Sequence, residues 1–214
     1  LSNEWQSRGT ITGNMDLSFP FSNALSSAID LDIRFQLSDF DLMVPDYDLD
    51  FRSLDGKGGF YLPHHLSGDF QGKLFDEKIS IKALSDRDSL KFALEGLADT
   101  KMINVVTELS IDEYLEGSFE YFAEMVFATN AKNRSNFTLE TDLEGMTVKL
   151  PLPFFKEQKE RIEFKINIDF TDDKEFAYLS YADHDLFLTT KEREMINGAI
   201  ALSGKALPND LPQN

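Results

Sequence analysis

The residues that could do chemistry are few, and the first to consider is the Asp183-His184-Asp185 run, which places two carboxylates around one imidazole. Such a run can bind a transition metal, but metal sites normally bring more ligands together, so it is more typical of a polar turn. The other two histidines, His64 and His65, are adjacent. On a strand they point to opposite faces and cannot share one metal ion. We therefore expect no metal site.

Catalytic motifs are absent from the sequence. Its 38 acidic residues mostly alternate with apolar ones, which is typical of a solvent-facing strand surface and not of two carboxylates converging in a cleft. There is no nucleophile elbow, phosphate-binding loop, dinucleotide fingerprint or zinc-protease motif, and no cysteine. We therefore expect a protein that is not an enzyme and that needs no cofactor.

The charge balance limits the partners. Thirty-eight acidic and 21 basic residues give a net charge of −17. This disfavours nucleic acid, whose phosphates require Lys and Arg, and disfavours charge-driven adhesion to anionic lipid headgroups. No apolar run approaches the roughly 20 residues of a membrane-spanning helix. Because the chain begins with Leu1 and not Met and enters a strand pattern within about ten residues, we expect a piece of a longer protein.

The elements available to position any site are strands with one apolar face. Residues 28–37 alternate strictly between apolar and polar, with Asp32 and Arg34 on the polar side. Successive side chains of a strand point to opposite faces. Residues 162–170 repeat this pattern, and residues 47–51 show a shorter version. In each segment the apolar members fall on one face of the strand: Ile29, Leu31, Ile33, Phe35, Leu37, Leu49, Phe51, Ile162, Phe164, Ile166 and Ile168.

Similar segments along the chain predict roughly twelve strands, many of them long, with connections too short for crossover helices, so antiparallel pairing is favoured. Gly56, Gly58 and Gly59 predict a turn after residues 47–51, and residues 85–88 predict a hairpin turn. The strand count alone is compatible with a sandwich, a barrel or an extended sheet.

The strand pattern is interrupted once. Residues 101–106 are ambiguous, and Ser110 with Glu113 fits a capping box that predicts a short helix ending at Gly117. We therefore predict that residues 1–214 form a single β-rich segment, with a candidate subdivision near residues 96–117.

One segment carries a family resemblance. Residues 142–156 read Asp-Leu-Glu-Gly-Met-Thr-Val-Lys-Leu-Pro-Leu-Pro-Phe-Phe-Lys. This run resembles a signature of the large AsmA-like envelope proteins, in the YhdP branch, and every fixed position of the signature is present. Four other segments resemble landmarks of this family in the same order: residues 13–20, 49–59, 66–81 and 198–207. Residues 66–67 and 76–77 depart from the family's glycine-containing hairpin.

The resemblance implies both a fold and a function. It implies an all-β, mainly antiparallel protein, with a long curled sheet or half-open β-groove and one or two short helices. The resemblance implies a long β structure in the periplasm that is anchored in the inner membrane by a segment outside this chain. It also implies that the parent protein carries phospholipid between the inner and outer membranes. The chain would then be one section of a lipid conduit, with the apolar residues named above lining the groove. Phospholipid or another acyl-chain lipid would be the ligand, and envelope proteins are candidate partners.

Three alternatives fit the same alternation. The strands can close on a dry core, as in a non-enzymatic structural or interaction module of the envelope. An outer-membrane β-barrel also alternates over about ten residues per strand. The uneven strand lengths, the interior prolines and the predicted short helix all argue against a barrel. A glycan-acting enzyme lacks a convergent acid–base pair. The deciding property is whether the apolar face is open or closed.

Overall fold

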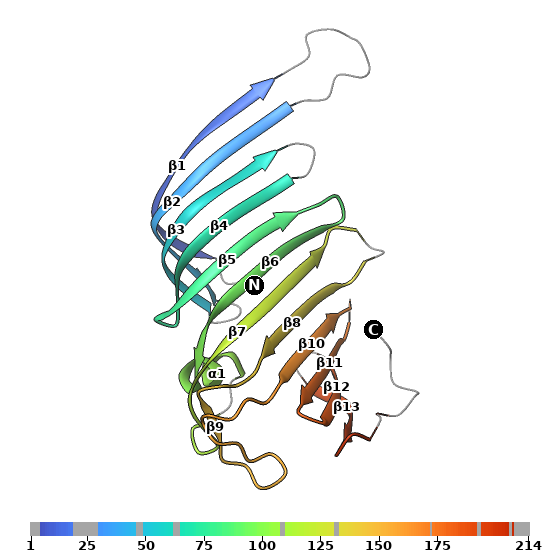
Figure 1. The fold of residues 1–214 in the computed structure, drawn as a ribbon. Helices are drawn as coiled ribbons and strands as arrows, with labels where there is room; N and C mark the ends of the chain where they lie inside the picture. Colours follow the sequence, from blue (N-terminus) through green and yellow to red (C-terminus); the bar gives the residue numbers. More distant parts are fainter. Residues whose placement is uncertain are drawn as a thin grey trace. The chain divides into compact units, whose positions relative to one another are not determined.

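The structure is a computed structural model that describes residues 5–18, 30–45, 49–61, 65–107, 110–130, 133–171, 173–191, 194–205 and 207. Within these residues the fold is all-β and antiparallel, with thirteen strands and one short helix, so the predicted fold class is confirmed (Figure 1). The elements are β1 (Gln6–Ser18), β2 (Asp30–Val44), β3 (Leu49–Tyr61), β4 (His65–Leu74), β5 (Glu77–Ser85), β6 (Ser89–Asp99), α1 (Thr100–Thr107), β7 (Leu115–Ala128), β8 (Ser135–Thr141), β9 (Met146–Val148), β10 (Phe164–Phe170), β11 (Glu175–Tyr181), β12 (His184–Lys191) and β13 (Glu194–Ala201).

The strands follow one another in the sheet almost in chain order. Hydrogen-bonded neighbours run from β1 to β8 and then from β10 to β13, while β9 pairs with the start of β7. Among the described residues, β1 and β13 each have a partner on one side only, so the sheet is open. This meander needs only short connections, which is the topology expected of antiparallel strands.

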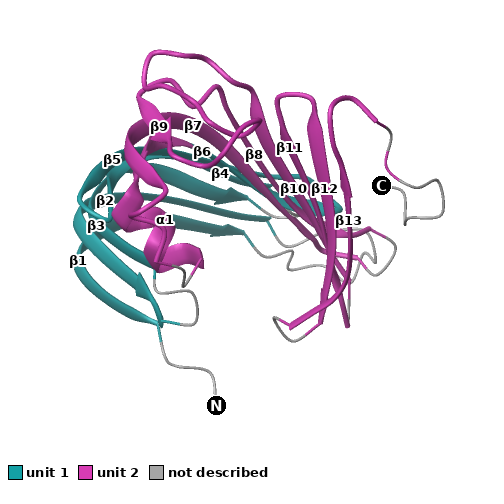
Figure 2. Cartoon of the chain, turned by 90° about the horizontal axis from the view of Figure 1, so that it is seen from below, with its two compact units in different colours: residues 1–94 teal, residues 95–214 magenta. Residues whose placement is uncertain are grey.

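The chain divides into two compact units, residues 1–94 and 95–214 (Figure 2). Unit 1 comprises β1 to β5 and the first part of β6. Unit 2 comprises the end of β6, α1 and the remaining strands. The predicted subdivision near residues 96–117 stays a prediction.

β-Bulges in β2 and β3 interrupt the pairing of the first three strands of unit 1. The pairing register shifts at Gly9 in β1, around Asp39 in β2 and around Ser53 in β3, and all three residues have a positive φ. The bulges are neighbours, because the Ser53 hydroxyl donates a hydrogen bond to Asp39 Oδ1 (3.0 Å). A bulge bends its strand and increases its twist. Accordingly, β1, β2 and β3 bend along their length in Figure 1.

These bulges correct the predicted strand boundaries. Of the strands expected from the alternation, residues 30–37 and 42–44 belong to one strand, β2, and residues 49–51 and 60–61 belong to one strand, β3. Residues 28–29, 47–48 and 62 lie outside the described residues. Each bulge inserts an extra residue, so the apolar positions change from odd to even numbers while staying on the same face. The alternation in the sequence therefore breaks at each bulge and predicts the end of a strand, although the strand continues.

The turn predicted at Gly56, Gly58 and Gly59 is wrong, because all three glycines lie inside β3. Here glycine makes room for aromatic rings. A Cβ on Gly58 would lie 2.4 Å from the Phe35 ring, and a Cβ on Gly56 would lie 2.7 Å from the Phe70 ring. The two rings stack with centroids 6.1 Å apart. Glycine inside a strand often marks such a close approach.

The helix predicted over residues 110–117 is also wrong. Ile111 O accepts hydrogen bonds from Tyr114 N and Leu115 N, which makes a single turn, and Leu115 then enters β7 opposite Val148 of β9. The helix lies earlier, as α1, and its cap is Asp99, whose carboxylate accepts a hydrogen bond from Met102 N (2.9 Å). The capping motif at residue 110 was thus outweighed by strand pairing.

The hairpin turn predicted at residues 85–88 is confirmed. Asp86 N donates a hydrogen bond to Ser89 O (3.0 Å), and Asp86 Oδ1 accepts from the backbone N–H groups of Asp88 and Ser89 (both 2.8 Å). These backbone hydrogen bonds lower the pKa of the Asp86 carboxyl.

Candidate functional site

The strand register of unit 1 gathers apolar side chains on one face. Residues directly opposite in an antiparallel ladder share a face. On β2, Leu31 lies opposite Leu17 of β1, and Ile33 lies opposite Met15 of β1 and Phe60 of β3. We call this surface the apolar face of unit 1; its members are Ile11, Met15, Leu17, Leu31, Ile33, Phe35, Leu37, Phe40, Leu42, Leu49, Phe51, Leu54, Phe60, Leu66, Phe70, Ile79 and Ile81.

The predicted site residues of unit 1 converge on this face. Leu31, Ile33, Phe35 and Leu37 lie on it before the bulge of β2, and beyond the bulges Phe51 pairs with Leu42, and Leu49 with Val44. The predicted residue Ile29 lies outside the described residues. The predicted site residues did not include Phe60 and Phe70. Phe60 lies two residues after Gly58, and Phe70 lies two residues from both Gly68 and Gly72, so each shares a strand face with its glycines. This spacing was a usable signal.

The apolar face of unit 1 is only half covered. On β1, Ile11 is 59% exposed and Met15 is 63% exposed. Within the described part of this unit, close contacts between strands join ladder neighbours, and no second layer of strands or helices packs on the face. An uncovered apolar surface of this kind is typical of a site that binds an apolar partner.

Unit 2 has a comparable surface. On β10, Ile166 lies opposite Leu139 of β8 and Leu179 of β11, and Leu179 in turn lies opposite Leu186 of β12. The predicted residues Phe164, Ile166 and Ile168 share this face, whereas Ile162 precedes β10 and donates its N–H to Asp142 O (2.7 Å). The apolar face of unit 2 consists of Phe137, Leu139, Phe164, Ile166, Ile168, Ala177, Leu179, Leu186, Leu188 and Ile200.

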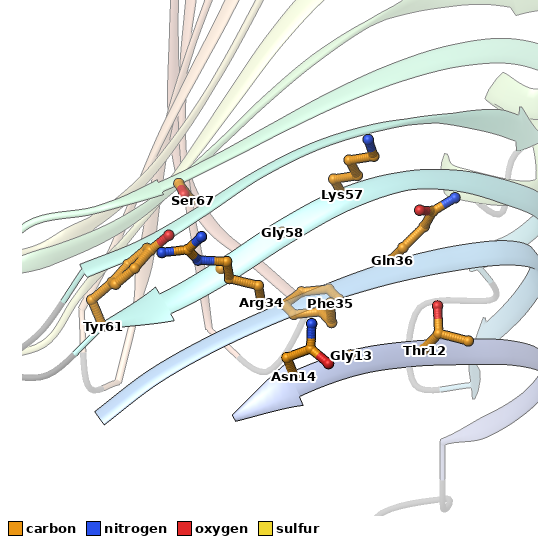
Figure 3. Close-up of a pocket in the computed structure, with 11 residues that line it drawn as sticks. Thr12, Gly13, Asn14, Arg34, Phe35, Gln36, Lys57, Gly58, Tyr61 and Ser67 are labelled. Carbon is orange, nitrogen blue, oxygen red and sulfur yellow. The ribbon is translucent and has the colours of Figure 1, made fainter. Parts of the chain in front are cut away.

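The opposite face of unit 1 is polar and contains a shallow depression of about 520 Å³ (Figure 3). Arg34 and Lys57 line it together with neutral polar side chains, and the Arg34 guanidinium lies beside Tyr61. Arg34 also pairs with Asp32 (2.8 Å), and this hydrogen bond raises the pKa of Arg34. Paired charges at the surface contribute little to stability, so this face is best described as a solvent-facing surface.

The opposite face of unit 2 combines a polar network with an aromatic cluster. Asn136 donates hydrogen bonds to Asn167 and to Asp169 Oδ1, the latter at 2.9 Å. On the neighbouring strands, Phe187 is completely buried and packs against Tyr178, with ring centroids 4.8 Å apart. The buried Asp169 carboxylate is therefore partnered by the Asn136 amide, which is a stabilising arrangement and not a reactive one.

The predicted polar turn is present, but of the Asp183-His184-Asp185 run only Asp183 lies in it, since His184 and Asp185 begin β12. Residues 182–183 form the turn between β11 and β12, and His184 is buried at the start of β12. Its Nδ1 accepts a hydrogen bond from Ser203 N (2.9 Å). Within the part of the chain that the structure describes, no group of three or more histidine, aspartate or glutamate side chains is arranged to hold a metal ion.

Comparison with known proteins gives one match. A sequence model of the family described as "YhdP protein" matches residues 2–212. Neither the curated proteins nor the solved structures contain a match to this chain. None of the helical segments described here has the length and hydropathy needed to cross a membrane.

Proposed function

We propose that this chain, which belongs to the YhdP protein family, is a section of a conduit that carries phospholipid acyl chains along the apolar faces of its two units. The family is one of cell-envelope proteins. The conduit would lie in the periplasm and connect the inner and outer membranes, with no covalent chemistry performed on the lipid.

The observation that carries this proposal is the half-covered apolar face of unit 1. The exposed side chains Ile11, Met15 and Leu17 lie in register with Leu37, Ile33 and Leu31, so the exposure belongs to one surface and not to scattered residues. Leaving this surface in water is unfavourable, and an acyl chain is a ligand that matches it over its whole length.

Energetics favour a continuous apolar path for lipid. Each methylene group exposed to water costs about 0.8 kcal/mol, so a chain of about 15 methylenes costs roughly 12 kcal/mol in the open. A strand face of Leu, Ile and Phe removes most of that cost. Such a face also holds the lipid strongly at no single position, because it has no polar group that fixes a ligand in place.

Photo-crosslinking in cells tests the proposal. The photoreactive residue p-benzoylphenylalanine at Ile33 or Ile168 should capture phospholipid, while the same residue at Asp32 or Lys165, on the opposite faces, should capture none. Capture only from Asp32 or Lys165 would overturn the choice of face. Absence of lipid at every position, in a folded protein, would instead favour a structural or interaction module of the envelope.

A further inference from the structure

The loop between β9 and β10 covers one end of the apolar face of unit 2. Part of this loop lies in residues 142–156, the segment that carries the family resemblance. That face ends at Tyr181 and His184, which lie opposite each other and two residues beyond Leu179 and Leu186. The Phe154 ring packs against both, with centroids 6.1 Å from Tyr181 and 5.0 Å from His184. Tyr181 also donates a hydrogen bond from its hydroxyl to Phe154 O (2.9 Å). Phe154 therefore covers the last row of the face.

The loop is held firmly at its base. Val148 and Lys156 exchange two backbone hydrogen bonds, of 2.9 and 3.0 Å. The Lys156 side chain is fully buried, and its Nζ donates to Met146 O (2.8 Å) and Glu157 O (3.0 Å). Pro151 and Pro153 restrict the backbone between these anchors. The Phe154 ring is thus kept in a fixed position over the strand ends.

The tip of the same loop has a different environment. Leu152 is 83% exposed, whereas Phe154 is half-buried on the strand face. Figure 1 shows the segment between β9 and β10 extending past the ends of the strands. Of these two apolar side chains, two residues apart, Leu152 therefore faces solvent and Phe154 packs on the strand ends. This difference provides a matched internal control.

We propose that Phe154 is a further lipid-contacting residue, the end wall of the apolar face of unit 2, and that Lys156 is its positioning residue. The inference rests on the proposed function. An acyl chain on the row of Leu179 and Leu186 would meet the Phe154 ring instead of the polar atoms of Tyr181 and His184. Because the ring is already fixed, contact with the chain loses little side-chain freedom. The occupant is an acyl chain, because the Phe154 ring covers Tyr181 and His184 on the same face as the apolar side chains Leu179 and Leu186.

Crosslinking at three positions of the full-length protein tests this assignment. With p-benzoylphenylalanine at Leu179, Phe154 or Leu152, one at a time, we expect phospholipid adducts at Leu179 and Phe154, several-fold above those at Leu152. Adducts at Leu179 but not at Phe154 would overturn the end wall, as would equal adducts at Phe154 and Leu152. Absence of adducts at Leu179 would overturn the proposed function itself, so the two failures are distinguishable.

The role of Lys156 is tested in the same assay. Lys156→Met, combined with the photoreactive residue at Phe154, should lower the lipid adduct at Phe154 several-fold and leave the adduct at Leu179 unchanged. Lys159→Met, which alters an exposed lysine three residues away, is the matched control and should change neither. An unchanged Phe154 adduct in the Lys156→Met protein would show that Lys156 does not position the wall.

Discussion

Replacement of Lys156 by Met gives the sharpest test of how residues 142–156 are held in place. The substitution keeps most of the side-chain volume but removes the ammonium group, which donates to Met146 O at 2.8 Å and to Glu157 O at 3.0 Å. Lys156 has no exposed surface. Met cannot donate a hydrogen bond, so both carbonyl groups would be left without this partner.

The expected loss follows from these contacts. A hydrogen bond to a charged group contributes about 1.5–3 kcal/mol, and leaving a buried carbonyl unsatisfied costs about 1–3 kcal/mol. Relief of the buried charge offsets part of this, because burial already lowers the pKa of Lys156. We expect Lys156→Met to reduce the free energy of unfolding by about 2–4 kcal/mol.

Urea unfolding followed by circular dichroism measures this loss, with Lys159→Met as the control.

The free energy of unfolding should also depend on pH in a defined direction. Because the folded state binds the Lys156 proton less tightly than the unfolded state, wild-type stability should rise relative to Lys156→Met as pH increases from the lowered pKa towards 10.5, the ordinary value. Equal stability of Lys156→Met and wild type would refute the two hydrogen bonds as stabilising contacts.

Three further perturbations test other parts of the fold. Gly58→Ala should cost about 1–3 kcal/mol by pushing the Phe35 ring off β3, because its Cβ would lie 2.4 Å from that ring. Gly59→Ala, whose Cβ would lie 3.0 Å from the Tyr61 ring, should cost less in the same urea titration. Burial raises the pKa of Tyr121 to about 12, so up to about 3 kcal/mol of stability, present below pH 10, should be lost as pH rises to 12. In alkaline unfolding Tyr121→Phe should lose less stability than wild type, although the raised pKa values of Tyr178 and Tyr181 keep part of the loss in both proteins; identical pH curves would contradict the assignment. Phe187→Ala should destabilise unit 2 by about 3–5 kcal/mol, and a loss below 1 kcal/mol, measured calorimetrically, would contradict its complete burial.

Most strands and the antiparallel pairing follow from the alternation of residue types, because a half-covered sheet needs that period of two. The boundaries within β2 and β3 did not follow, since the bulges at Asp39 and Ser53 shift the phase without ending the strand. A signal was available: the apolar spacing of three between Leu37 and Phe40 marks an inserted residue.

Two other errors share one physical cause, which is that long-range contacts outweigh local preference. Glycines usually indicate turns, but Gly58 is needed where Phe35 lies flat on the strand. The capping box at Ser110 is a weak local signal, and the pairing of Leu115 with Val148 prevents a helix from continuing there. Neither contact partner could be identified from sequence spacing alone.

The candidate surface was predictable as a set of side chains but not as an open surface. The alternation places Leu31, Ile33 and Phe35 on one face in any sheet. It does not reveal whether protein covers that face, because a sandwich core gives the same pattern. The exposure of Ile11 and Met15 comes only from the three-dimensional structure.

The lipid content of the purified, folded full-length protein tests the central claim most directly. Mass spectrometry of its organic extract should detect phospholipid, and a protein with Ile33→Asp and Ile166→Asp, one change on each apolar face, should carry several-fold less while remaining folded by circular dichroism. A folded wild-type protein without acyl-chain lipid, or an Asp variant with undiminished lipid, would contradict the account.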